Sequence, residues 1–140
     1  MRLSLASLAL VSCLLTPLAH AETGSLAVTV TGIRTATGTI QIALYDEAGF
    51  GPGKAVHDAT LPVTGDTVTW TLQGVAPGAY GVKLFQDVDS NGKMNTNPFG
   101  LPIEPYGFSN NAKGSFGPPG FAAAAFTVGA GETLQTIILE

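Results

Sequence analysis

Alternation of apolar and polar residues runs through most of the chain and predicts β-strands. The pattern is clearest from Ser25 to Ile33, from Thr39 to Tyr45 and from Thr67 to Leu72. Four further strands are predicted, at Ala55 to Val63, Tyr80 to Asp87, Ala122 to Val128, and Thr133 to Leu139. The first of these has a weaker pattern, and Pro62 marks it as an edge strand. No segment keeps a helical period.

Seven predicted strands without helices indicate an all-β fold. We expect a seven-stranded antiparallel Greek-key sandwich of the immunoglobulin or prealbumin kind, with one long ordered loop. The first two strands are predicted to form a hairpin that turns at Thr37-Gly38, and Trp70 is predicted to lie in the core. Ala122 to Ala125 could start a helical turn, but Phe126-Thr127-Val128 and the flanking glycines favour a strand.

The first 21 residues have the pattern of a secretory signal peptide. Arg2 is followed by an apolar run from Leu3 to Leu15, and Ala19-His20-Ala21 fits a cleavage site. Because the run is too short to span a bilayer, no transmembrane segment is expected. Cleavage would leave residues 22–140 as a single domain in the periplasm or outside the cell. Leu10-Val11-Ser12-Cys13 offers an alternative, a lipid anchor on Cys13.

Charge and cysteine content limit the classes of partner. Residues 22–140 hold ten acidic and five basic residues, a net charge of −5, and no cysteine. A net negative charge argues against nucleic acid or anionic lipid, which need a basic patch. Without disulfides, the fold must be held by its core or by a metal.

Residues 88–120 form a long stretch without regular period. Its apolar side chains are too many for a disordered segment, so we expect an ordered loop that packs over the end of the sandwich. These side chains are Phe99, Leu101, Ile103, Tyr106, Phe108 and Phe116. They could form a small core under the loop, or stack on a sugar or a partner protein. The candidate binding residues are Tyr106, Phe108, Asn110 and Asn111.

The loop begins with oxygen-bearing side chains at alternate positions, Asp87, Asp89 and Asn91, and then Asn95. Calcium takes six to eight oxygen ligands, and Gly92 permits the tight turn that would aim them at one point. Lys93 would contribute its backbone carbonyl. Pro98 stands where a calcium loop has its bidentate acid, and Glu104 could reach back to replace it. The alternative is a polar turn whose side chains cap its own amides.

Two motifs run from Gly78 to Asn95 (G-A-Y-G-V-K-L-F-Q-D-V-D-S-N-G-K-M-N) and from Gly100 to Asn111 (G-L-P-I-E-P-Y-G-F-S-N-N). They resemble the bacterial family catalogued as domain of unknown function 2141. Gln86 stands where the family often has His, and Asn95 where it often has Asp. The turn at Ala76 to Tyr80 is also similar to transthyretin-like and carboxypeptidase-regulatory-like sandwiches. The resemblance implies a sandwich fold and no established activity.

The sequence offers few catalytic groups. Residues 22–140 contain one histidine, His57, no thiol and no Gly-x-Ser-x-Gly elbow. Asp87, Asp89 and Glu104 could form the acid/base pair of a small glycosidase-like hydrolase. Cation binding accounts better for their spacing, because it also explains Gly92. The expected function is therefore a non-catalytic binding or structural module of the cell envelope, with calcium as its cofactor and a protein or carbohydrate as its partner.

Overall fold

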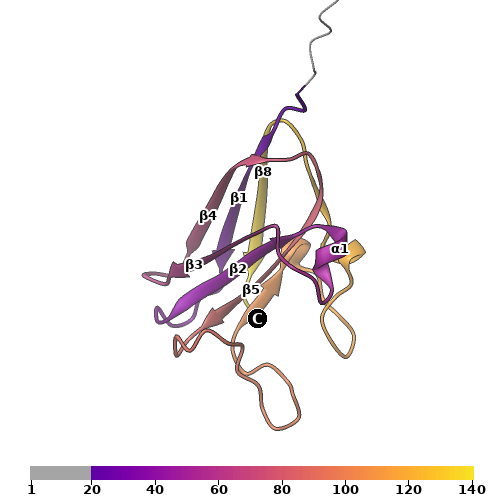
Figure 1. Cartoon of the computed structure of the whole chain (residues 1–140). Coiled ribbons are helices and arrows are strands. Elements are labelled where there is room, and N and C mark those ends of the chain that lie inside the picture. Colours follow the sequence, from indigo (N-terminus) through magenta and orange to yellow (C-terminus); the bar gives the residue numbers. More distant parts are fainter. Residues whose placement is uncertain (1–19) are drawn as a thin grey trace, which may run out of the picture.

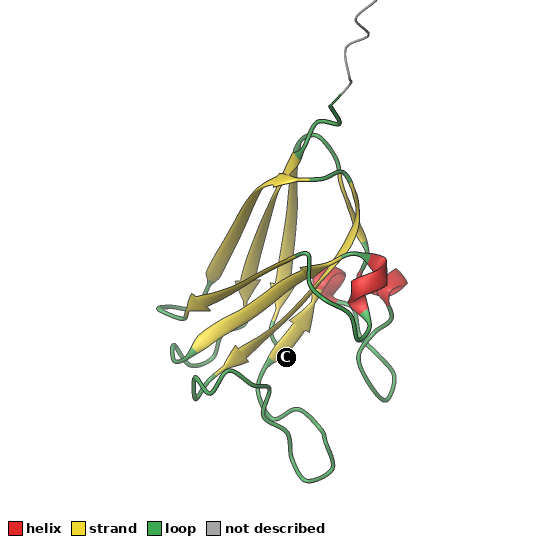
Figure 2. Cartoon of the chain, in the orientation of Figure 1, coloured by secondary structure: helices red, strands yellow, loops and turns green. Residues whose placement is uncertain are grey.

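A computed structural model describes residues 20–140, which form two β-sheets packed face to face (Figure 1). The strands are β1 (Gly24–Thr31), β2 (Thr39–Tyr45), β3 (His57–Pro62), β4 (Val68–Val75), β5 (Gly78–Asp87), β6 (Tyr106–Phe108), β7 (Phe126–Val128) and β8 (Glu132–Ile138). Within these residues there are three short helices, α1 (Glu47–Phe50), the 3-10 turn η1 (Ser109–Asn111) and α2 (Phe121–Ala124). Figure 2 shows helices in red among the yellow strands. The predicted all-β sandwich is confirmed, with eight strands instead of seven.

The two sheets divide the strands unequally. One sheet has the order β4-β1-β8, and the other has the order β3-β2-β5-β6, with β7 also paired to β5. The predicted edge strand β3 is at an edge. One pairing departs from the antiparallel expectation, because β1 and β8 run parallel over seven residue pairs.

The predicted hairpin between β1 and β2 is wrong, because the two strands lie in different sheets. Each strand has one apolar face, and placing the strands in opposite sheets lets both faces share the core. The link between them, residues 32–38, packs on the end of β5. A Cβ on Gly38 would lie 2.0 Å from the carbonyl oxygen of Asp87. Gln86 donates hydrogen bonds of 2.8 Å to the carbonyl oxygens of Thr35 and Thr37.

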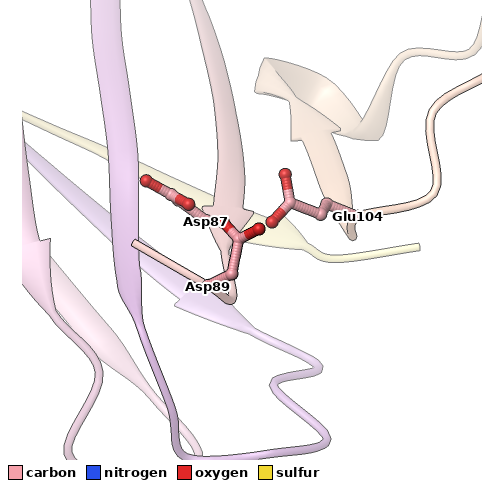
Figure 3. A group of neighbouring side chains, drawn as sticks. All are labelled: Asp87, Asp89 and Glu104. Atoms are coloured by element: carbon pink, nitrogen blue, oxygen red, sulfur yellow. The ribbon is translucent and has the colours of Figure 1, made fainter. Parts of the chain in front are cut away.

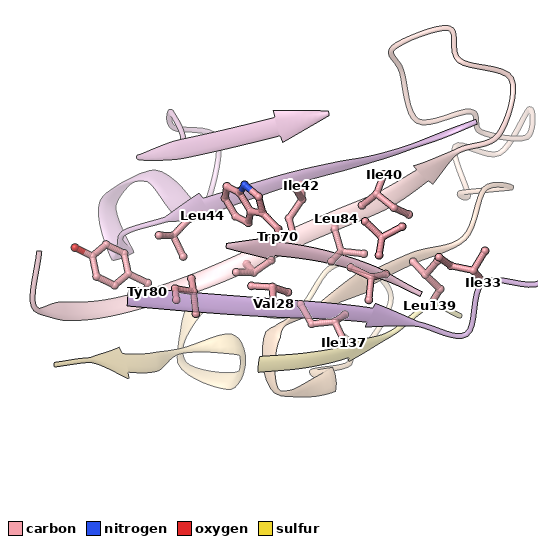
Figure 4. Close-up of a cluster of buried hydrophobic side chains, with 14 of the residues drawn as sticks. Val28, Ile33, Ile40, Ile42, Leu44, Trp70, Tyr80, Leu84, Ile137 and Leu139 are labelled. Carbon is pink, nitrogen blue, oxygen red and sulfur yellow. The ribbon is translucent and has the colours of Figure 1, made fainter. Parts of the chain in front are cut away.

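The core lies between the sheets and contains Trp70, as predicted (Figure 4). The strands contribute every second side chain, which is the alternation seen in the sequence. Its fully or nearly fully buried members include Leu26, Val28, Val30, Ile40, Ile42, Leu44, Val82, Leu84 and Ile137.

The edge of the second sheet is split, because β6 and β7 pair with different ends of β5. Residues 109–125 leave the edge between them and include α2, so the strand predicted from Ala122 is wrong in its first half. Ser109 links β5 to the segment that precedes β7. Its buried hydroxyl accepts a hydrogen bond from the Val82 N–H (2.9 Å) and donates one to the carbonyl oxygen of Ala124.

The predicted small core under the long loop is wrong for four of its residues. Phe99 is 89% exposed and Phe116 is completely exposed, and Leu101 and Ile103 are also exposed. The loop between β5 and β6 projects away from the sheets instead of folding back on them (Figure 1). Its backbone groups bond to one another, so the loop closes on itself and leaves these side chains outside.

The predicted signal peptide falls outside the described residues except for its last two positions, and Cys13 falls wholly outside them. In residues 20–140, none of the helices has the length and apolar content needed to cross a membrane.

Replacing Ser109 with alanine should destabilise the fold by about 1–3 kcal/mol, because the buried N–H of Val82 and carbonyl of Ala124 would lose their partner. Chemical denaturation measures the free energy of unfolding. Ser115→Ala is the matched control, since Ser115 is exposed. Equal stabilities of the two variants would contradict this role for Ser109.

Candidate cation site and aromatic groove

The turn that follows β5 is built around the carboxylate of Asp87. Ser90 and Gly92 have positive φ angles of 57° and 78°, which reverse the chain within a few residues. One oxygen of Asp87 accepts a hydrogen bond from the Asn91 N–H (3.0 Å), and the other accepts one from the Gly92 N–H (2.7 Å). Asp87 is therefore buried, with only 1% of its surface exposed, yet fully hydrogen-bonded.

Glu104 approaches the same turn from the segment that precedes β6. One carboxylate oxygen accepts a hydrogen bond from the Val88 N–H and the other from the Asn95 N–H, both at 2.9 Å. The Gln86 N–H donates to the carbonyl oxygen of Pro105 and holds this segment beside the end of β5. Glu104 thereby ties the turn, the projecting loop and the approach to β6 together.

The carboxylates of Asp87, Asp89 and Glu104 converge, each offering an oxygen within 4.8 Å of the others (Figure 3). Asp87 and Glu104 are buried and Asp89 is exposed. In residues 20–140, no lysine or arginine forms an ion pair with any of the three, and the one such pair joins Lys113 to Glu140. Like charges this close repel, and a cation between them would relieve that repulsion.

The predicted amide ligands, Asn91 and Asn95, contact Asp89. Their side-chain nitrogens both donate to one Asp89 oxygen, at 3.1 and 2.8 Å. The Asn91 oxygen accepts from the Lys93 N–H, and the Asn95 oxygen accepts from the Asn91 amide. Both side-chain amides thus point their nitrogen atoms toward Asp89. To bind a cation there, each amide would have to rotate and present its oxygen instead. The observed hydrogen bonds are those expected for the alternative, a polar turn whose side chains cap its own amides.

Beside this cluster lies a groove of about 960 Å³ between residues 94–102 and residues 112–119. Its aromatic lining consists of Tyr45, Phe85, Phe99, Tyr106, Phe108 and Phe116. Tyr106 and Phe108 meet edge to face, with their ring centroids 6.0 Å apart. The ammonium group of Lys83 lies 4.7 Å from the ring centroid of Tyr45, and partial burial lowers the pKa of this lysine.

The four predicted binding residues divide into two pairs. Tyr106 and Phe108 line the groove. Asn110 and Asn111 have positive φ angles of 58° and 50°, and their side chains hold backbone in place. The Asn110 amide donates to the carbonyl oxygen of Ala125 (2.8 Å), and the Asn111 side-chain oxygen accepts from the Ile138 N–H (2.9 Å). The two asparagines therefore brace α2 and β8.

Sequence reasoning missed the roles of Gln86 and Ser109. Both are buried polar residues, and both bond to backbone groups far away in the sequence. A polar residue within an apolar strand, as Gln86 is in β5, is a signal of such a role. The bonding partners of the two residues, 15 to 51 positions away, are visible only in the fold.

The chain belongs to the family described as "Uncharacterized protein conserved in bacteria (DUF2141)", whose model matches residues 28–136. The family resemblance predicted from the two loop motifs is confirmed. No curated protein and no solved structure matches the chain.

A hydrogen bond from the Asn95 side chain is the largest cause that lowers the pKa of Asp89 below its ordinary value. Asn95→Ala should therefore raise this pKa, measured by NMR titration of the Asp89 carboxyl carbon. Because the folded-state pKa is depressed, the bond stabilises the fold above the unfolded-state pKa, and this contribution is lost as the pH falls through the folded-state pKa. Thr96→Ala should leave the titration unchanged, and an unchanged titration in Asn95→Ala would contradict the assignment.

Proposed function

We propose that this protein is an exported, non-catalytic module of the bacterial cell envelope, in which a calcium ion stiffens the long loop and the aromatic groove binds a protein or a carbohydrate. One observation carries the proposal. Three carboxylates converge at the base of the loop that forms one wall of the groove. An ion held there would fix the position of that wall.

The donor set fits calcium better than other metals. The cluster offers hard oxygen ligands and neither thiol nor imidazole, which calcium prefers and zinc does not. Asp87, Asp89 and Glu104 would supply charge, with the side-chain oxygens of Asn91 and Asn95 and the carbonyl of Lys93 as the neutral ligands proposed from the sequence. Because the two amides must first rotate, we expect weak binding, on the order of millimolar, which is typical of extracellular modules.

Hydrogen bonding supports a non-catalytic role for the cluster. All four oxygens of Asp87 and Glu104 accept backbone N–H groups. A glycosidase acid must give and regain a proton at an oxygen that reaches the substrate. Here the two buried carboxylates are engaged in holding the loop. The hydrolase alternative predicts loss of turnover with an intact fold in Glu104→Gln, whereas our proposal predicts loss of stability.

Calcium at 10 mM should stabilise the protein by about 1.4 kcal/mol for a dissociation constant near 1 mM, a shift of several degrees in melting temperature. Thermal unfolding in chelator and across a calcium series measures the shift. Asp89→Asn should abolish the response, because it removes an exposed ligand without disturbing the buried bonds of Asp87. Asp66→Asn, at an exposed site elsewhere, is the control. A melting temperature of the parent protein independent of calcium would refute the cation site.

Export is supported by the signal-like pattern in residues 1–21. Protein recovered from cells that express the full chain should begin at Glu22, as intact-mass spectrometry would show. A lipid-modified chain that begins at Cys13 would show that the module is anchored to a membrane and is not free. An uncleaved chain in the cytoplasm would contradict export.

A further inference from the structure

The loop from Asn97 to Ile103, here called the tip loop, exposes three large apolar side chains. Phe99 is 89% exposed, Leu101 60% and Ile103 64%. No charged residue occurs from Met94 to Ile103, although the chain as a whole has a net charge of −4. Isolated exposed apolar residues are ordinary, but three on one uncharged projecting loop mark a contact surface.

The backbone of the tip loop satisfies its own hydrogen-bond donors. Asn97 is responsible for most of this. Its N–H bonds to the Leu101 carbonyl, its carbonyl accepts the Gly100 N–H, and its side-chain oxygen accepts the N–H groups of Phe99 and Leu101. The Ile103 N–H bonds to the carbonyl of Asn95, and Pro98 and Pro102 have no N–H. Every N–H from Asn97 to Ile103 is therefore paired or absent.

This pairing distinguishes among the surfaces that could cover the tip loop. A partner that adds a strand bonds to free backbone donors, and the tip loop has none to offer. Near the apolar part of a bilayer, unpaired backbone polar groups are costly. An uncharged loop with apolar side chains and no free N–H lowers that cost. It fits a lipid surface better than a polar partner.

We infer that the tip loop inserts Phe99, Leu101 and Ile103 into the interface of a neutral, zwitterionic lipid bilayer. Insertion rests on apolar burial and not on headgroup charge, because the loop carries no basic residue and the chain is acidic. It requires neither an occupied cation site nor a ligand in the groove, and so goes beyond the function proposed above.

Phe116 lies on the other wall of the groove and should contact the lipid less deeply. It is completely exposed and has a positive φ of 60°. Within residues 20–140, the N–H groups from Gly114 to Gly117 have no hydrogen-bond partner. Because these donors need water, this second loop should remain at the headgroup level.

Tryptophan reporters test the insertion site by site. Phe99→Trp, Phe116→Trp and the control Leu134→Trp are each prepared from cells that express the full chain, so that any processing is the cell's own. Leu134 is 68% exposed but lies on β8, in the other sheet. With phosphatidylcholine vesicles, emission at position 99 should shift to the blue and be quenched by brominated acyl chains. The effect should be weaker at position 116 and absent at 134, with Trp70 as a constant buried background.

Vesicle sedimentation measures the contribution of the side chains. Phe99→Ser/Leu101→Ser should lower the partition coefficient onto phosphatidylcholine about tenfold or more relative to the parent. Both substituted residues are exposed, so the melting temperature should remain that of the parent. Leu134→Ser/Val56→Ser removes exposed apolar side chains elsewhere and should leave partitioning unchanged.

Four results would overturn the inference. The first is the same emission response to vesicles at positions 99 and 134, and the second is an emission shift at position 99 only with anionic lipid. The third is an emission shift that needs no vesicles and grows with protein concentration, which marks self-association. The fourth is an emission shift that occurs only when oligosaccharide is added. Each measurement is made in chelator and in calcium. Insertion in both conditions supports the inference even if the calcium melting experiment fails, so the two proposals can fail separately.

Discussion

The arrangement of the loop region depends on the hydrogen bonds that Asp87 and Glu104 accept at the end of β5. Each carboxylate takes two backbone N–H groups, so four donors from residues 88–95 converge on two buried side chains. A carboxylate bonded in this way is strongly held, because bonds to a charged acceptor are stronger than those between neutral groups. The direction in which the tip loop leaves the sandwich follows from this arrangement.

The end of β5 is also where the two sheets are joined. Gln86 and Asp87 are adjacent, so their side chains leave opposite faces of the strand. Gln86 bonds to the link between β1 and β2, while Asp87 bonds to the turn that follows β5. Side chains at the end of β5 therefore shape the backbone around them. Ser109, Asn110 and Asn111 belong to the same group, since their side chains bond to α2, β5 and β8.

The sequence predicted the fold class and most strand positions, because alternation reports which face of a strand is buried. It did not predict strand partners. Alternation is the same whether β1 faces β2 across the core or pairs with it in a sheet, so the predicted hairpin failed. The three-residue strand β6 and the four-residue helix α2 are too short to show a period.

The candidate site was predictable in part. The spacing of Asp87 and Asp89 suggested shared ligation, and the structure places Glu104 beside them. The pairing of their oxygens with backbone amides could not be foreseen, because it depends on the path of the loop. The prediction that Phe99 and Phe116 are buried was wrong. Buried residues are mostly apolar, but the converse, that apolar residues are buried, does not hold. A core is apolar, but an apolar residue on a self-bonded loop need not reach it.

The parallel pairing of β1 and β8 has a consequence for the order in which the protein forms. Ser25 pairs with Glu132, so the partners are 132 − 25 = 107 positions apart. The first strand cannot gain its parallel neighbour until nearly the whole chain is available, and a contact so distant in sequence forms slowly. Until β8 is available, β1 has one open edge and an incomplete core beneath it. β8 completes this sheet, so the native sheet cannot form before residues 132–138 are available.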